Sequence, residues 1–259
     1  MPSVKRAAVV TIERDGVGDA LTRLEAVAER CGVELVESDD ADIAIVLGGD
    51  GTMLRALARF LGSNVPVIGV NYGRVGFLTA IGGAELDTAM TRVFAGDYRT
   101  VELATLEVTV AGRTSMAIND VVVAGGTLGR MIEVGYSIGG EELGSQPCDG
   151  LICATPAGST AYNLSNGGPV LVWGLDALVL TFVAPHALHI RPLVVPRGPD
   201  VEITNLTVGL DATVLCDGHT VGGLTTGERA TVRIGKEQSL LATLPEVTFF
   251  ARYAATFGR

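Results

Sequence analysis

The stretch VLGGDGTMLRAL (residues 46–57) places one carboxylate, Asp50, in a glycine cluster where an apolar run meets a helix pattern. The run DIAIVL (42–47) has the length and uniform hydrophobicity of a parallel strand that is covered on both faces. The segment TMLRALARFL (52–61) follows with the pattern of a helix. This succession predicts an open α/β sheet, whose ligands bind beyond the carboxyl ends of its strands.

The same alternation continues on both sides of this stretch. RAAVVTI (6–12) and VPVIGV (65–70) are further apolar runs of strand length. VGDALTRLEAVAERCG (17–32) repeats apolar residues at helical spacing, and AELDTAMTRVF (84–94) predicts another helix. We therefore expect residues 1–97 to form an open α/β, Rossmann-like domain.

After residue 98 the pattern changes to short apolar pieces separated by glycine-rich turns, with little helical periodicity. Residues 98–259 are therefore predicted to form a β-rich, β-sandwich-like domain. The sequence does not decide whether the terminal segment VTFFARYAATFGR (247–259) stays with this domain or folds back onto the first one. The predicted strands lie in LEVTVAGRTSMAINDVVVAGG, MIEVGYSI, GLICAT, ALVLTFV, DVEITN, ATVLCDG and RATVRIG.

Composition narrows the class of protein. The 259 residues are 47% hydrophobic and 19% charged, which is typical of a folded globular chain. The net charge of -10 argues against nucleic acid as a partner, because phosphate backbones are bound by surfaces rich in Lys and Arg. Anionic ligands must therefore be bound by local features of the fold.

No segment of the sequence predicts a membrane span or a secretory signal. The longest apolar runs, such as ALVLTFVA (177–184), fall well short of the roughly 20 residues that cross a bilayer. We expect a cytoplasmic protein whose cysteines are reduced and serve as small buried side chains. These cysteines are Cys31, Cys148, Cys153 and Cys216.

The glycine-rich loop predicts a phosphate site with an acid in it. Gly48, Gly49 and Gly51 let backbone N–H groups approach an anion, and Thr52 is a suitable N-cap for the following helix. Asp50 would repel a phosphate unless a cation or a proton transfer belonged to the reaction. It is therefore predicted to accept a proton from an attacking hydroxyl or to position Mg²⁺ on a polyphosphate. A plain strand-to-helix turn with Asp50 as a cap is an equal alternative.

Further candidates follow other strands. VNYGRVGFLT (70–79) should emerge at the same sheet edge as Asp50, and its Phe77 suits either a nucleobase contact or, more often, a core anchor. Asn119 and Asp120 suit ribose hydroxyls or the capping of a strand end.

The segment CDGLICATPAGSTAYNLSNGGPV (148–170) is too polar for filler and fits a sugar or a base better than bare phosphate. The histidines show no metal-ligand spacing, so no protein-held metal is predicted. The polar candidates in the segment are Thr155, Ser159, Thr160, Tyr162, Asn163 and Ser165.

Six motifs occur in the order seen in NAD kinases, over about residues 43–218. GGDGT alone also resembles diacylglycerol kinases, sphingosine kinases and phosphofructokinases, whereas the long TPxGSTAY element separates NAD kinases from these groups. The chain therefore resembles the NAD kinase family. The motifs are GGDGT, NYGRVGFL, AINDVVV, DGLICATPAGSTAYNLSNGGPV, PHALHIRPLVVP and VLCDG.

The resemblance implies a phosphotransferase that acts on an alcohol group. It implies Mg²⁺-dependent phosphoryl transfer from ATP or polyphosphate to the 2′-hydroxyl of the adenosine ribose of NAD, in a homodimer or homotetramer. Asp50 would be the general base or the organiser of the metal. The implied binding residues are Gly49, Gly51 and Thr52 at the phosphates, Phe77 at the adenine, Asn119 and Asp120 at the ribose, and Asp149, Thr160, Ala161, Tyr162 and Ser165 on the remaining NAD surface, partly from a neighbouring subunit.

Two arginines are added as candidates for neutralising phosphate charge: Arg55, one turn beyond the loop, and Arg130. The chain also departs from the family pattern, because Ala157 replaces a usual Thr or Ser and Asn166 replaces a usual small residue. A dinucleotide-binding regulatory protein without transfer activity is therefore an alternative. A lipid kinase of the GGDGT type is a weaker one, because the polar segment 148–170 does not suit an acyl chain.

Overall fold

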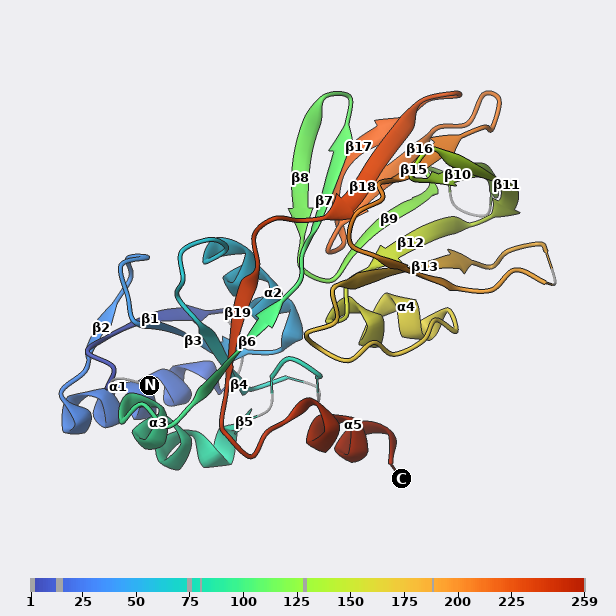
Figure 1. The fold of residues 1–259 in the computed structure, drawn as a ribbon. Coiled ribbons are helices and arrows are strands. Elements are labelled where there is room, and N and C mark those ends of the chain that lie inside the picture. Colours follow the sequence, from blue (N-terminus) through green and yellow to red (C-terminus); the bar gives the residue numbers. More distant parts are fainter. Residues whose placement is uncertain are drawn as a thin grey trace. The chain divides into compact units, whose positions relative to one another are not determined.

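The computed structural model describes residues 3–12, 16–73, 76–79, 81–127, 130–187 and 189–258. The chain divides into two compact units (Figure 1). The first contains Met1–Leu103 together with Gln238–Arg259, and the second contains Ala104–Glu237.

A seven-stranded sheet forms the centre of the first unit. Its first four strands are parallel, β19 runs parallel to β4, and β6 runs antiparallel to β19. The order across the sheet is β2 (Glu34–Val36), β1 (Arg6–Thr11), β3 (Ile43–Gly48), β4 (Val67–Asn71), β19 (Ser239–Thr243) and β6 (Arg99–Leu103), with β5 (Ile81–Gly82) paired to β4.

Helices cover both faces of this sheet (Figure 1). Ile43, Ile45 and Leu47 of β3 pack with α1 (Val17–Cys31) and α3 (Leu86–Phe94). Alternate residues of a strand point to opposite faces, so Ala44 and Val46 face the other side, where α2 (Asp50–Arg59) lies. Every residue of β3 is buried, which explains its uninterrupted apolar sequence. A 3₁₀ turn (Gly83–Glu85) precedes α3, and α5 (Phe249–Phe257) closes the chain.

The start of α2 differs from the prediction. The helix begins at Asp50, its N-cap is Gly49, and no side chain caps it. The Thr52 N–H bonds to the Gly49 carbonyl within the first turn, at 2.9 Å. The Thr52 side chain is 3% exposed. The predicted N-cap role of Thr52 is therefore wrong, because the extended backbone of Gly49 starts the helix three residues earlier.

Two six-stranded antiparallel sheets make up the second unit and share one apolar core. That core joins Val134 and Val232 of one sheet to Val121 and Val214 of the other, so the predicted sandwich-like arrangement is confirmed. One sheet has the order β11 (Glu141–Cys148), β10 (Ile132–Ile138), β15 (Val201–Asn205), β18 (Arg229–Ile234), β7 (Leu106–Val110), β8 (Arg113–Ala117); the other has β14 (Leu193–Pro196), β13 (Ala177–Val183), β12 (Gly150–Ala154), β9 (Asp120–Gly125), β16 (Ala212–Cys216), β17 (His219–Leu224).

The boundary between the units lies at Leu103, whereas the sequence pattern placed it near residue 97. The C-terminal segment from Gln238 belongs to the first unit. It enters that unit as β19, where the Ser239 hydroxyl donates to the Leu57 carbonyl at 2.8 Å. The terminal helix α5 follows in the same unit, which answers the question that the sequence left open.

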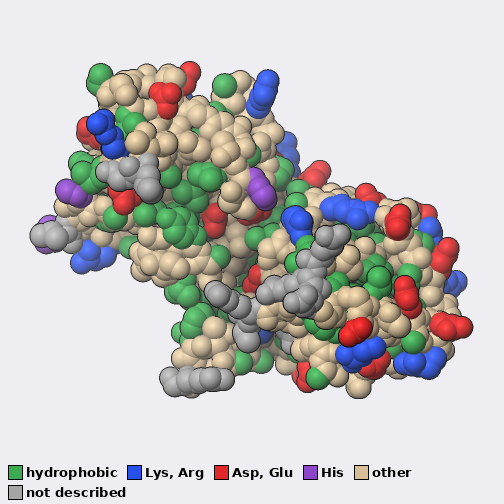
Figure 2. Space-filling model, turned by 180° about the vertical axis from the view of Figure 1, so that it is seen from behind, with side chains coloured by type: hydrophobic (Ala, Val, Ile, Leu, Met, Phe, Trp, Pro, Cys, Tyr) green, Lys and Arg blue, Asp and Glu red, His purple; other side chains and the backbone are tan. Residues whose placement is uncertain are grey.

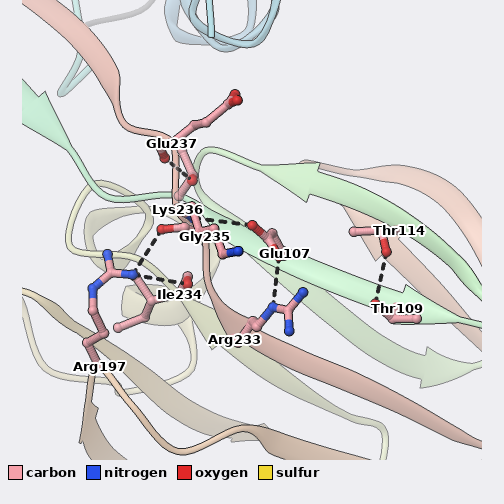
Figure 3. Close-up of polar contacts among 10 residues, drawn as sticks. Glu107, Thr109, Thr114, Arg197, Arg233, Ile234, Gly235, Lys236 and Glu237 are labelled. Carbon is pink, nitrogen blue, oxygen red and sulfur yellow. Dashed lines mark hydrogen bonds and ion pairs between the residues drawn. The ribbon is translucent and has the colours of Figure 1, made fainter. Parts of the chain in front are cut away.

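Polar contacts hold the end of the second unit in place (Figure 3). The Glu107 carboxylate accepts from Arg233 Nε at 2.8 Å and from the Lys236 N–H at 3.2 Å. The hydrogen bond from Arg233 lowers the pKa of Glu107. Arg197 Nη1 donates to the carbonyls of Ile234 and Gly235 at 3.2 and 3.1 Å. These bonds fix the strand end from which the chain leaves the unit.

The surface charges and the burial of the cysteines agree in part with the predictions from the sequence. Figure 2 shows Asp and Glu side chains interspersed with Lys and Arg on the face drawn. Within the described ranges, no helix is long and apolar enough to cross a membrane.

All four thiols are free. Burial raises the pKa of Cys148, Cys153 and Cys216 to about 12, whereas Cys31 is exposed, contrary to the prediction of a buried side chain.

Candidate functional site

Asp50 lies at the carboxyl end of β3 and is the first residue of α2. Its half-buried carboxylate accepts hydrogen bonds from three successive backbone amides of the loop after β4: Phe77 N at 2.6 Å, Leu78 N at 3.1 Å and Thr79 N at 3.0 Å. The Thr79 hydroxyl adds a fourth donor at 2.9 Å. The two loops that follow β3 and β4 therefore meet at one sheet edge, as their order in the sequence predicted.

Gly76 is required for this contact. A Cβ at position 76 would overlap the Asp50 carboxylate. Only a residue without a side chain lets the 76–79 backbone close around Asp50. The alternative in which Asp50 merely caps its own helix does not describe the structure, because no side chain caps α2. Asp50 instead anchors the neighbouring loop.

The other candidates near α2 differ in their exposure. Gly49 is half-buried and Gly51 is exposed at the helix N-terminus, where a Cβ on Gly51 would meet no atom within 4 Å. This backbone is open to a ligand, and the positive end of the helix dipole favours an anion there. Thr52 lies underneath, packed against Gly48, while Arg55 is exposed on the next turn.

The Phe77 side chain packs on the C-terminal helix and is 8% exposed. Its ring centroid lies 5.4 Å from that of Phe249, edge-on, and 6.2 Å from that of Phe257. This placement agrees with the core-anchor interpretation of Phe77.

Arg252 of α5 is a feature of this region that the sequence pattern did not reveal. Its Nη1 donates to the Phe77 carbonyl, and its side chain is buried. Beside it lies a cavity of about 320 Å³. The cavity is lined by Asn71, Gly76, Thr79, Ile81, Gly82, Glu246, Val247, Ala251, Arg252, Ala255 and Thr256.

A second carboxylate cradle lies within the second unit. The Asp217 carboxylate accepts from the backbone amides of Ile118 at 2.8 Å, Asn119 at 2.7 Å and Asp120 at 3.1 Å. Asp217 heads the tight β16–β17 turn with φ of 47°. Its role was missed because its partners lie 97 to 99 residues away in the chain.

The cradle leaves polar groups that suit a ligand. Asn119 Oδ1 is buried and has no hydrogen-bond partner among the described residues. Asp120 is 7% exposed, and burial, followed by the nearby charge of Asp217, raises its pKa to about 7. A buried polar atom without a hydrogen-bond partner and a carboxyl with a raised pKa are both typical of binding sites.

The raised pKa of Asp120 predicts a pH-dependent stability. Because the folded-state pKa exceeds the value of 3.8 for a free carboxyl, this group favours folding below about pH 4. That contribution is lost as the pH rises through about 7. This pKa shift corresponds to a loss of up to about 4 kcal/mol in the free energy of unfolding. We expect urea denaturation to show a larger stability loss from pH 4.5 to 8 in the wild type than in Asp120→Asn. Equal losses in both proteins would contradict the assignment.

Three polar side chains of segment 155–165 make hydrogen bonds to backbone carbonyls of the same unit. The Thr155 hydroxyl donates to the Ile118 carbonyl at 2.7 Å, Ser159 Oγ donates to the Pro156 carbonyl at 2.7 Å, and Asn163 Nδ2 donates to the Ser159 carbonyl at 2.9 Å. All three side chains are buried. These predicted ligand contacts are therefore structural. A Cβ on Gly158 would overlap the Asn119 carbonyl, which shows how closely the segment packs on Asn119.

The remaining candidates of the segment are accessible. Thr160 and Ala161 are half-buried, and Ser165 is exposed in the short helix α4 (Tyr162–Ser165). Tyr162 is 45% exposed. The structure thus brings Asn119 and Asp120 together with the segment that carries these four residues.

Asp149 and Arg130 lie at the opposite end of the same strands. Gly150 pairs with Ala124 and Ala154 pairs with Asp120, so the length of β12 separates the two ends. Four steps of about 3.3 Å make this roughly 13 Å. The Asp149 carbonyl accepts from the Gly125 N–H at 3.1 Å, and both Asp149 and Arg130 are exposed. One copy of this unit therefore does not bring Asp149 and Arg130 to the Asn119 cluster.

Among the residues that the structure describes, no group of three or more His, Cys, Asp or Glu side chains could hold a metal ion. A divalent cation often binds through one or two carboxylates and the phosphates of a substrate. The Asp50 carboxylate lies beside the open N-terminus of α2, but residues 77–79 donate to both of its oxygens, so it can take a cation of that kind only after one of these donors is displaced.

Family models match both halves of the chain: the ATP-NAD kinase N-terminal domain at residues 7–98 and the ATP-NAD kinase C-terminal domain at residues 118–244. The NAD kinase of Heliobacterium modesticaldum is 39% identical over 240 residues, which cover 90% of this chain and 85% of that protein. The NAD kinase of Gemmatimonas aurantiaca is 37% identical over 233 residues, covering 88% and 81%.

Two solved structures are similar in fold. Yeast NADH kinase complexed with NADH has a TM-score of 0.86 at 19% identity, over 99% of this chain and 88% of that one. An NAD kinase from Archaeoglobus fulgidus in complex with ATP has a TM-score of 0.78 at 27% identity, over 98% and 97%. Both matches span the α/β unit and the β-rich unit.

Proposed function

The chain belongs to the NAD kinase family, and we propose that it transfers a phosphoryl group from ATP or polyphosphate to the 2′-hydroxyl of the adenosine ribose of NAD, which forms NADP. The observation that carries this proposal is the Asp50 carboxylate, set at the sheet edge between an open helix N-terminus and a closely packed glycine loop. Phosphoryl transfer needs this pairing of an anion site with a proton acceptor.

Asp50 is proposed to receive the proton of the attacking hydroxyl. As the 2′-oxygen bonds to the γ-phosphorus, the bond from that phosphorus to the donor's bridging oxygen breaks, and ADP or a shortened polyphosphate leaves. In the structure, the donors of residues 77–79 occupy both carboxylate oxygens. One must give way to the incoming hydroxyl. Thr79 Oγ1 can do so by side-chain rotation, without movement of the backbone.

The donor phosphates are proposed to lie at the N-terminus of α2. Gly49 and Gly51 expose backbone there, and Arg55 offers a positive charge one turn further on. The Thr52 side chain is buried, so Thr52 is proposed to act only through its backbone in the first turn of α2 and not through its hydroxyl. In the alternative to its proton-acceptor role, Asp50 would position Mg²⁺, which when bound would neutralise charge on the donor phosphates.

The NAD-facing groups of the second unit are proposed to be Asn119, Asp120, Thr160, Ala161, Tyr162 and Ser165. The support is the unpartnered Asn119 Oδ1 and the exposed ring of Tyr162. Asp149 and Arg130 lie at the far strand ends, so we propose that they serve a neighbouring copy in a homodimer or homotetramer. The adenine role of Phe77 would require its ring to leave Phe249 and Phe257, and we propose an anchoring role in its place.

A direct assay tests the function. We expect purified protein with NAD, Mg²⁺ and ATP or polyphosphate to form NADP, detected by an NADP-specific dehydrogenase. Parallel assays with NADH or with diacylglycerol in place of NAD show which of these acceptors is phosphorylated. NAD binding in calorimetry without NADP formation from either donor would favour a regulatory protein and refute the kinase.

A further inference from the structure

We propose that Arg252, on the C-terminal helix α5, is a positioning residue that holds the 77–79 loop in the form that cradles Asp50. This proposal rests on the proposed function for its catalytic consequence. It also makes a structural claim that can be tested without any activity.

The main contact is a hydrogen bond from Arg252 Nη1 to the Phe77 carbonyl. The N–H of the same residue donates to Asp50 Oδ2 at 2.6 Å. Residue 77 is therefore held through its carbonyl by Arg252 and through its amide by Asp50. Because hydrogen bonds at the two ends of one peptide group polarise one another, the bond from Arg252 to the Phe77 carbonyl strengthens the bond from the Leu78 N–H of the same peptide group to Asp50 Oδ2, at 3.1 Å.

Aromatic packing fixes α5 on the same loop. The Phe77 ring lies against Phe249 and Phe257, at centroid distances of 5.4 and 6.2 Å. Phe249 precedes Arg252 by three residues and Phe257 follows it by five, so Arg252 lies between the two phenylalanines along the helix axis. The apolar contacts bring the helix to the loop, and the guanidinium sets the direction of the Phe77 carbonyl.

Electrostatics explain why a cation at this position is coupled to Asp50. The Arg252 side chain is 8% exposed, and this burial lowers its pKa to about 10. The negative charge of Asp50 opposes that shift, so Arg252 stays protonated at neutral pH. Burying a guanidinium is costly unless charges and acceptors compensate it. The Asp50 loop supplies this compensation, and loss of the cation should loosen the loop.

The test compares Arg252→Ala with Arg92→Gln. Arg92 Nη2 bonds to Glu246 Oε2 at 3.0 Å, so the control removes an ion pair that also ties the C-terminal segment to the unit. That ion pair does not involve residues 77–79. Both variants are checked for folding by thermal denaturation, and Arg252→Gln replaces the alanine variant if the latter does not fold.

Amide hydrogen exchange of Phe77, Leu78 and Thr79 is the first measurement. We expect it to be at least about tenfold faster in Arg252→Ala than in the wild type or in Arg92→Gln, because the loop that carries these amides is no longer held against the Asp50 carboxylate. Unchanged exchange in Arg252→Ala would overturn the proposal. This result decides the positioning claim even if the wild type formed no NADP, an outcome that would refute only the proposed function.

Kinetics and chemical rescue are the second measurement. We expect kcat of Arg252→Ala to fall by about 10- to 100-fold, because the Asp50 carboxylate is misplaced, and KM for NAD to stay within about twofold. The cavity beside Arg252 can admit a small cation, so millimolar methylguanidinium should restore part of kcat, whereas urea should not. A kcat equal to that of Arg92→Gln, or equal effects of methylguanidinium and urea, would contradict the positioning role.

Discussion

Asp50→Asn is expected to lower kcat for NADP formation by about 10²- to 10⁴-fold, the usual contribution of a positioned general base. The dissociation constant for NAD should stay within about threefold, because all the proposed NAD contacts except the one to the attacking hydroxyl lie on other residues. The side-chain amide of this variant cannot accept the hydroxyl proton, and its NH₂ group would face the donors of the 77–79 loop. Steady-state kinetics with calorimetry of NAD binding measures both quantities.

The control for this variant is Thr79→Val, which removes one donor to Asp50 and keeps the carboxylate. Loss of one hydrogen bond to a charged group lowers stability by about 1.5–3 kcal/mol. The Thr79 hydroxyl is the donor proposed to leave the carboxylate before the reaction, so this variant should retain far more turnover than Asp50→Asn. Full turnover in Asp50→Asn would remove Asp50 from the mechanism. A parallel loss of NAD binding would give it a structural role only.

Gly76→Ala is expected to be the second most damaging change. Its Cβ would overlap the Asp50 carboxylate, so either the carboxylate or the backbone of residues 76–79 must move. We expect kcat to fall by about 10²-fold, the scale associated with misplacing a reacting group by about 1 Å. The free energy of unfolding should fall by about 1–3 kcal/mol as Asp50 loses hydrogen bonds.

Gly18→Ala is the matched control. Gly18 lies in α1, and a Cβ there meets no atom within 4 Å. Alanine favours the helix by up to about 1 kcal/mol, so this variant should be at least as stable as the wild type, with unchanged kcat. Kinetics and urea denaturation of both variants separate a local clash from a general effect of added side chains. Wild-type kcat in Gly76→Ala would show that the close approach to Asp50 is not needed for turnover.

The regular elements were predictable where apolar runs are uninterrupted or strictly periodic. DIAIVL and the helix over residues 17–32 match β3 and α1 closely, because burial on both faces or on one helical stripe writes a clear pattern. β11 and β17 were not predicted, since their largely exposed residues give no apolar alternation. The return of β19 to the first sheet depends on pairing with β4 and β6, which a local pattern does not encode.

The site was predictable to the level of its loops but not of its contacts. The order of the apolar strands correctly placed Asp50 beside the loop after β4, because parallel strands end at a common edge. The sequence did not show that Ser159 and Asn163 bond to their own segment, or that Thr155 bonds to the Ile118 carbonyl. It also could not show the part played by Arg252, whose partner Phe77 lies 175 residues away. Such partners are fixed by the tertiary fold.

The role of Asp50 is tested most directly by kcat/KM of the double variant Asp50→Asn, Gly76→Ala against the two single variants. If Gly76 acts only by admitting the Asp50 carboxylate, the double variant should be as slow as Asp50→Asn alone, within about threefold. A loss equal to the product of the two single losses would show that the loop and the carboxylate act independently. That result would contradict a catalytic Asp50 held by residues 77–79.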